Sequence, residues 1–112
     1  MSEFLKNAFL DNYLTRQEWG KLIGINRKTI ARWETEIIQQ VPPVKAQYFP
    51  LDRSIRAHYL DNYQRFLIAC ILVAKGGLER RSRSYESVIK FLKVNFSDLK
   101  RENFEQWVKN NV

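Results

Sequence analysis

The sequence predicts a mainly α-helical fold, and three observations support this class. Apolar residues recur at helical spacing along most of the chain, N-capping residues precede several of these stretches, and glycines follow others. The length of 112 residues and the hydrophobic content of 45% suit a single packed core. A double glycine at 76–77 divides the chain into residues 1–76 and a C-terminal helical extension, residues 77–112.

Three helices are expected before the first proline. An amphipathic helix over residues 2–12 comes first. The second follows Thr15, whose capping box is completed by Glu18, and ends at Gly24, because glycine readily adopts the left-handed backbone of a helix exit. Asn26 is the expected N-cap of the third helix. The apolar face of the second helix is expected to consist of Trp19, Leu22 and Ile23.

Two prolines, Pro42 and Pro43, interrupt the helical pattern. Proline lacks the backbone donor and biases the residue before it toward extended structure. Residues 41–53 are therefore expected to form a loop or a short β-excursion. The candidate strand residues in this segment are Tyr48, Phe49 and Leu51. A long, mostly apolar helix is expected from 54 to 75, where the double glycine ends it.

The C-terminal extension is expected to contain two helices. The first runs through Val88 and Leu92, and the last begins near Ser97 or Asp98 and includes Phe104. We expect these two helices to cover one side of the long apolar helix.

Positive charge is concentrated in two segments. The formal net charge is +7, with five basic and two acidic residues in 16–34, and six basic and two acidic residues in 75–93. The last fifteen residues carry three of each sign. A local basic excess indicates a polyanionic partner, although a solvated surface tuned for solubility would have a similar composition.

The sequence lacks the residues that several functional classes require. With one cysteine, Cys70, and one histidine, His58, no intramolecular disulfide and no cysteine/histidine zinc site is expected. The longest apolar run, 66–74, is too short for a bilayer and no export signal is visible, so we expect a cytoplasmic chain with no membrane partner. No catalytic arrangement stands out, so we expect neither enzymatic activity nor a cofactor.

The most informative stretch, Arg16 to Trp33, predicts two short helices joined by a tight turn. Gly20 is expected where the helices cross and Gly24 in the turn. The small core between the helices is expected to consist of Trp19, Ile23, Ile25, Ile30 and Trp33. The outward positions of the second helix are Arg27, Lys28, Thr29, Ala31 and Arg32. Such cationic and hydroxyl side chains can bind base edges or phosphates. The competing interpretation is a hairpin packed for structure alone.

Residues 14–34, with the double proline that follows, resemble the DNA-binding domain of MerR-type regulators, and the similarity extends to residue 76. The resemblance implies a mainly α, winged helix-turn-helix fold with a short β wing and C-terminal helices. It places Lys28 and Thr29 where the family has a polar pair that meets DNA. The chain departs from the family at Arg32, where an aromatic residue is usual, and it lacks the glycine expected at the wing tip.

Two sets of site residues follow from this interpretation. The expected DNA-binding residues are Arg16, Asn26, Arg27, Lys28, Thr29, Arg32, Lys45, Gln47, Arg53 and Arg56, the last four from the wing. The expected homodimer face consists of Phe66, Ile68, Ile71, Leu72, Phe104 and Trp107. For each residue of the second set, a place in the intramolecular core is the competing interpretation.

The sequence therefore favours a sequence-specific, double-stranded DNA-binding transcriptional regulator, a homodimeric repressor without a sensor domain, at the bacterial nucleoid. In this it is similar to small MerR-type repressors of mobile elements, including those that control CRISPR-associated transposon genes. Two alternatives stay open. One is an excisionase-like protein that bends DNA for recombination, and the other is a protein-interaction adaptor whose helix at 26–40 docks a partner.

Overall fold

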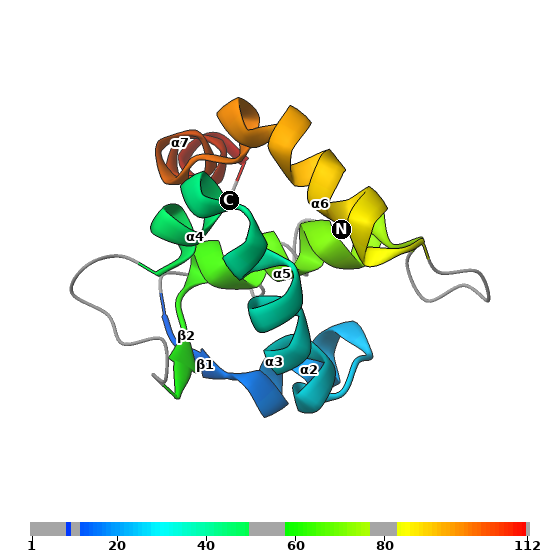
Figure 1. Ribbon diagram of the computed structural model, residues 1–112. Helices are drawn as coiled ribbons and strands as arrows, with labels where there is room; N and C mark the ends of the chain where they lie inside the picture. Colours follow the sequence, from blue (N-terminus) through cyan, green and yellow to red (C-terminus); the bar gives the residue numbers. More distant parts are fainter. Residues whose placement is uncertain (1–8, 10–11, 50–57, 77–82, 112) are drawn as a thin grey trace.

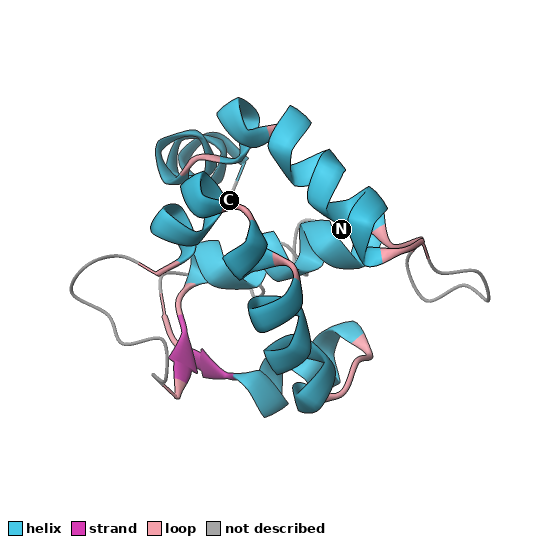
Figure 2. Ribbon diagram, in the orientation of Figure 1, coloured by secondary structure: helices cyan, strands magenta, loops and turns pink. Residues whose placement is uncertain are grey.

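Short helices surround a central one in the computed structural model, which describes residues 9, 12–49, 58–76 and 83–111 (Figures 1 and 2). In chain order the elements are β1 (Leu14–Thr15), α2 (Arg16–Ile23), α3 (Arg27–Glu36), the 3-10 turn η1 (Ile38–Gln40), α4 (Pro42–Tyr48), β2 (Tyr59–Leu60), α5 (Asn62–Ala74), α6 (Tyr85–Val94), the 3-10 turn η2 (Phe96–Leu99) and α7 (Arg101–Asn111). None of the helices in these ranges is long and apolar enough to cross a bilayer. The mainly helical class is confirmed, whereas the helix expected at 2–12 falls almost entirely outside the described residues.

The two strands form a small antiparallel sheet, with Leu14 opposite Leu60 and Thr15 opposite Tyr59. One strand leads directly into α2 and the other precedes α5, so the sheet ties the starts of these two helices together. The sheet contains none of the described residues of 41–53, the segment expected to be a loop or a short β-excursion.

The two prolines begin a helix rather than the expected loop or short β-excursion, which corrects the expectation for this segment. Pro42 and Pro43 lie in the first turn of α4, where a missing N–H leaves no helical bond unmade. Val41, the residue before them, has the extended backbone that proline favours. Tyr48 is the last residue of α4 and is fully buried, while Leu51 lies outside the described residues.

The caps predicted around α2 and α3 are confirmed. The Glu18 main-chain N–H donates to Thr15 Oγ1 at 3.1 Å, and the Thr15 N–H donates to Glu18 Oε1 at 2.8 Å. Gly24 ends α2 with φ 81°, a left-handed conformation. Asn26 caps α3, accepting from the Lys28 N–H at 2.7 Å. These local bonds fix both ends of α2, the start of α3 and the turn between the two helices.

Gly20 was expected at the crossing of the two helices, and its closest approach is instead to the backbone of the turn at Ile25. A Cβ atom at this position would meet the carbonyl oxygen of Ile25, a backbone atom that cannot move aside cheaply. Trp19, Ile30 and Trp33 are buried between the two helices. Ile23 and Ile25 pack at the edge of this core.

Leu22 does not belong to the buried face of α2. Its side chain is 56% exposed, whereas Trp19 is fully buried and Ile23 is partly buried. Positions three and four apart share a helix face only approximately, and here α3 lies against the side of α2 that carries Trp19. The prediction that Leu22 belongs to the buried face of α2 is therefore wrong.

Helix α5 lies across the middle of the molecule, between the α2–α3 pair and helices α6 and α7 (Figure 1). It begins at Asn62, after a capping box of Asp61 and Gln64. Tyr59 and Leu60 are a strand, which corrects the expected start at 54. At its other end, Gly76 adopts φ 103° just after the helix. The last helix, α7, begins at Arg101 rather than near Ser97 or Asp98, because η2 occupies those positions.

The C-terminal extension shares one hydrophobic core with the rest of the chain. This core includes or contacts the six residues that were expected to form a homodimer face. Ile68, Ile71 and Phe104 are buried within the chain. Phe66, Leu72 and Trp107 are half-buried and pack against the same core, and the ring centroids of Phe66 and Phe104 lie 4.8 Å apart. Ile68, Ile71 and Phe104 therefore belong to the intramolecular core, and Phe66 packs against Phe104 and Trp107 of α7.

A buried arginine on α5 holds the segment before β1 in place. Arg65 is completely buried, and its Nη1 donates to the carbonyls of Asn12 at 2.9 Å and Leu60 at 3.0 Å. Its Nη2 donates to Asn12 Oδ1 at 2.9 Å. Its guanidinium also lies 5.9 Å from the Trp19 ring centroid. The charge is thus buried with its hydrogen bonds satisfied, as an ionised group in a core requires.

Candidate nucleic-acid interface

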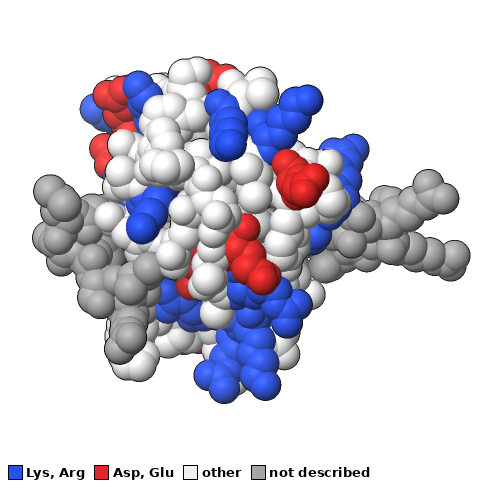
Figure 3. Space-filling view, in the orientation of Figure 1, with Lys and Arg blue, Asp and Glu red and all other residues white. Residues whose placement is uncertain are grey.

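Helix α3 presents a row of exposed positions on one side. Arg27, Lys28, Ala31 and Arg32 are exposed, and Thr29 is half-buried. The pairs 27/31 and 28/32 are four residues apart, so these side chains project from the same face of the helix. Figure 3 shows lysine and arginine side chains gathered over α2 and α3, at the bottom of the view. The structure therefore brings together Arg27, Lys28 and Arg32 as expected.

The charge at the start of α3 opposes the helix dipole. The first turn carries Arg27 and Lys28 and no acidic residue. Cations near a helix N-terminus cost stability, about 0.3–1 kcal/mol each when exposed. The same arrangement attracts anions, because the dipole and both side chains act with the same sign. A local electrostatic conflict of this kind is typical of a functional surface.

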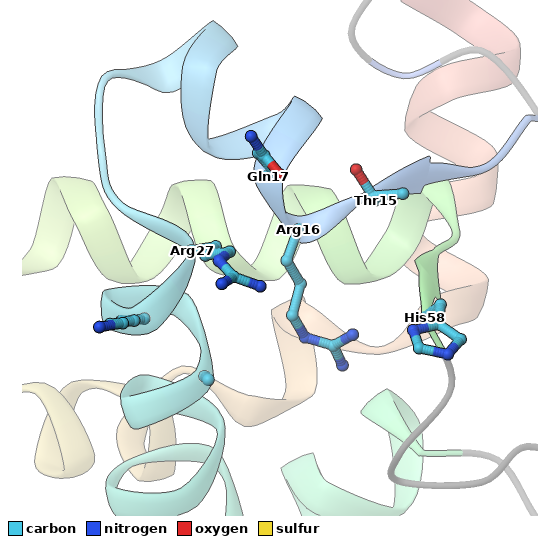
Figure 4. A pocket seen from close by; sticks show the side chains of 7 residues that line it. Thr15, Arg16, Gln17, Arg27 and His58 are labelled. Atoms are coloured by element: carbon cyan, nitrogen blue, oxygen red, sulfur yellow. The ribbon is translucent and has the colours of Figure 1, made fainter.

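A concavity of about 480 Å³ lies beside these cations (Figure 4). Three elements and the residue before β2 contribute to its wall, which consists of Thr15, Arg16, Gln17, Arg27, Lys28, Ala31 and His58. We call this space the sheet-side concavity. Arg16 extends into the space between Arg27 and His58 (Figure 4). None of these lining residues is acidic.

A second concavity of about 440 Å³ lies on the turn side of the same cations. It is lined by Gln17, Lys21, Ile25, Asn26, Arg27 and Lys28. Both concavities are lined by Gln17, Arg27 and Lys28, so these three side chains separate one concavity from the other. Sequence reasoning missed Gln17 and Lys21, although their spacing of four residues puts both on one face of α2.

Arg16 lies in the sheet-side concavity but is also paired inside the protein. Its Nε and Nη2 donate to the two carboxylate oxygens of Glu34, each at 2.8 Å. Tyr48 donates its hydroxyl to Glu34 Oε2 at 2.6 Å. Burial by itself lowers the pKa of Arg16, but the hydrogen bonds and charge of Glu34 outweigh it, and the net pKa is raised. Arg16 is therefore a fixed cation at the edge of the concavity.

The other residues that were expected to bind DNA fall into three groups. Asn26 has a structural task, since its side-chain oxygen caps α3. Lys45 and Gln47 lie on α4 and not on a wing, which corrects both positions. Lys45 is exposed there, whereas Gln47 Oε1 accepts from the Arg101 N–H at 2.9 Å. Arg53 and Arg56 lie outside the described residues.

The described residues hold no group of three or more histidine, cysteine or carboxylate side chains placed to bind a metal ion. The two concavities on α2 and α3 are lined instead by cationic side chains, amides and the imidazole of His58. These groups are hydrogen-bond donors suited to an anionic partner.

Comparisons of the chain with family models, with curated proteins and with solved structures found no match.

Proposed function

We propose that the protein binds double-stranded DNA sequence-specifically, with α3 in the major groove. The observation that carries the proposal is the exposed cationic face of α3 formed by Arg27, Lys28 and Arg32, on a helix held across a tight turn from α2. An α-helix is about 10–12 Å wide with its side chains, and the major groove of B-DNA is about 12 Å wide. The helix N-terminus would enter first, as in helix-turn-helix proteins.

The side chains of α3 can make two kinds of contact with DNA, to base edges and to the backbone. Arg27, Lys28 and Arg32 can donate to guanine O6 and N7 or to phosphates, and Thr29 can bond a base or touch a thymine methyl group. Backbone contacts set the register of the helix, and base contacts select the sequence. Four such groups along two turns could read a short half-site.

In its cellular role we propose a transcriptional repressor in the bacterial cytoplasm that binds as a homodimer. Two-fold dimers place two recognition helices one DNA turn apart, about 34–36 Å, and so bind palindromic operators. The buried positions of Ile68, Ile71 and Phe104 mean that such a dimer would use a surface other than the one the sequence indicated.

Selection of bound duplexes from a random pool, read by sequencing, tests the proposal. We expect enrichment of a short motif, repeated with two-fold symmetry if the protein is a dimer. The matched comparison uses Lys28→Ala with Arg32→Ala against Lys90→Ala with Lys93→Ala, because both variants lose two exposed lysine or arginine charges. Enrichment should fail for the α3 variant and persist for the α6 variant.

Two other outcomes of this experiment would support the alternative functions. Tandem sites without two-fold symmetry, beside a recombination site, would indicate an excisionase-like architectural role. No enrichment from the pool, together with one stoichiometric protein retained after nuclease treatment, would contradict DNA binding and favour an adaptor.

A further inference from the structure

We propose that Lys21 of α2 binds a phosphate of the DNA backbone in the second concavity, on the turn side of α3. We call this space the turn-side concavity; its wall consists of Gln17, Lys21, Ile25, Asn26, Arg27 and Lys28. The inference rests on the proposed DNA-binding function and deepens it, because it gives α2 a direct contact with DNA in addition to the exposed face of α3.

The wall of the turn-side concavity brings cations from two helices together. Lys21 lies in the last turn of α2, whereas Arg27 and Lys28 begin α3, and all three side chains are exposed. Gln17 is also exposed, and it shares a face of α2 with Lys21, four residues away. None of the residues that line this space is acidic. The wall therefore presents ammonium, guanidinium and amide donors, and a phosphodiester accepts hydrogen bonds from all three.

The backbone of the turn is already bonded, so a ligand in the concavity would meet side chains. The Ile25 N–H donates to the Gly20 carbonyl at 2.9 Å, and the Lys28 N–H donates to Asn26 Oδ1 at 2.7 Å. The candidate site is thus a set of side chains held on a hydrogen-bonded turn, and it does not depend on the N–H groups at the start of α3.

Glu18, three residues before Lys21, is the acidic residue nearest to it in the sequence. Its carboxylate accepts from the Thr15 N–H at 2.8 Å, and it does not line the concavity. The hydrogen bonds from Thr15 lower the pKa of Glu18 most, and the charge of Lys21 contributes least. Glu18 therefore serves the cap of α2, and the ammonium of Lys21 faces a space without carboxylates.

The shape of DNA would place a phosphate at this position. The two backbones form the walls of the major groove, so the first turn of a helix that enters the groove has a backbone beside it. The turn-side concavity adjoins Arg27 and Lys28 of that first turn, and its volume of about 440 Å³ has room for a phosphate group and several waters. Lys21 would meet the backbone while α3 meets the bases, and this contact would set how α3 is seated.

Substitution of Lys21 tests the assignment. Lys21→Gln removes one exposed charge from α2, and the matched control Lys90→Gln removes one exposed charge from α6. The net charge of the two variants is the same, so their long-range fields change by similar amounts. The logarithm of affinity for a duplex with the selected motif is measured against the logarithm of salt concentration, after circular dichroism has shown that each variant is folded.

Loss of one phosphate contact should reduce the steepness of this salt dependence by about 0.9 for Lys21→Gln and leave it unchanged for Lys90→Gln. The relative affinities for single-base variants of the motif should stay the same, because phosphate contacts carry no sequence information. A wild-type slope for Lys21→Gln would overturn the phosphate contact while leaving DNA binding intact. A loss confined to one base pair would also overturn it, since Lys21 would then bind a base. If the wild-type protein binds no duplex, the proposed function fails as well.

Single neutral methylphosphonate linkages, placed one at a time in the same duplex, locate the contact. Lys21→Gln should weaken binding to the normal duplex by roughly fivefold or more, but have no effect when one particular phosphate is neutral, as a double-mutant cycle reports. A lysine that only complemented the dipole at the end of α2 would give the same effect at every linkage. That uniform result would remove Lys21 from the interface.

Discussion

Arg101 and Asp61 join the start of the last helix to the start of the central one. Arg101 Nη2 donates to Asp61 Oδ2 at 2.9 Å, and Asp61 also caps α5. Arg101 Nε donates to the Gln47 carbonyl at 2.7 Å, and the guanidinium lies 4.6 Å from the Tyr63 ring centroid. A single side chain therefore connects α4, α5 and α7.

Replacing Arg101 should loosen the C-terminal extension. Arg101→Ala removes an ion pair and a bond to a backbone carbonyl, both partly shielded from water. We expect the free energy of unfolding to fall by about 1–3 kcal/mol, because Asp61 and Gln47 lose a charged donor. Chemical denaturation measures the change, with Lys93→Ala on the exposed side of α6 as the control. A change no larger than that of the control would contradict the role given to Arg101.

The two glycines of the α2 segment should respond differently to substitution. Gly20→Ala gains helix propensity, but its Cβ meets the Ile25 carbonyl. We therefore expect a net loss of about 1–3 kcal/mol of unfolding free energy. Gly24→Asn should cost much less, because asparagine tolerates the left-handed backbone observed there. Thermal unfolding of both variants checks the order, and the reverse order would contradict the close approach at Gly20.

Lys28 should contribute to affinity for the selected duplex. Lys28→Ala is expected to weaken binding by about 1–3 kcal/mol if the side chain meets a base edge. Lys90→Ala makes the same change of net charge on α6 and should leave affinity within a factor of two. Gel-shift titration at one fixed salt concentration provides the comparison. Unchanged affinity for Lys28→Ala would remove Lys28 from the interface.

Cys70 should react slowly in the folded protein. Burial raises the pKa of its thiol to about 11, so little thiolate forms near neutral pH. A thiol-reactive dye at pH 8 should label the native chain much more slowly than the unfolded chain. Labelling at the same rate in both states would contradict this burial.

The same pKa has a consequence for stability. The unfolded thiol releases its proton at a lower pH than the folded one, so above the unfolded pKa the folded state holds more protons. Stability should therefore fall as the pH rises from the ordinary thiol range toward 11, and Cys70→Ser should reduce this dependence in unfolding titrations.

Predictions from the sequence succeeded where the signal is local. The capping box of Thr15 and Glu18, the left-handed Gly24 and the cap at Asn26 each involve bonds within three or four residues. The exposed cations of α3 followed from their spacing once the helix was known. The start of α4 was missed because proline has opposite effects in the first turn of a helix and in its interior.

The sequence by itself determined the α2–α3 pair and the row of cations that α3 carries, because caps, turns and helical spacing depend on neighbouring residues. Only the tertiary structure decided which side chains are buried. It placed Arg65 in the core, left Leu22 exposed, and used Gln47 to hold Arg101. It also placed Glu34 beneath Arg16. The physical reason is that burial and pairing depend on which elements lie opposite each other, and residues far apart in the chain settle that together.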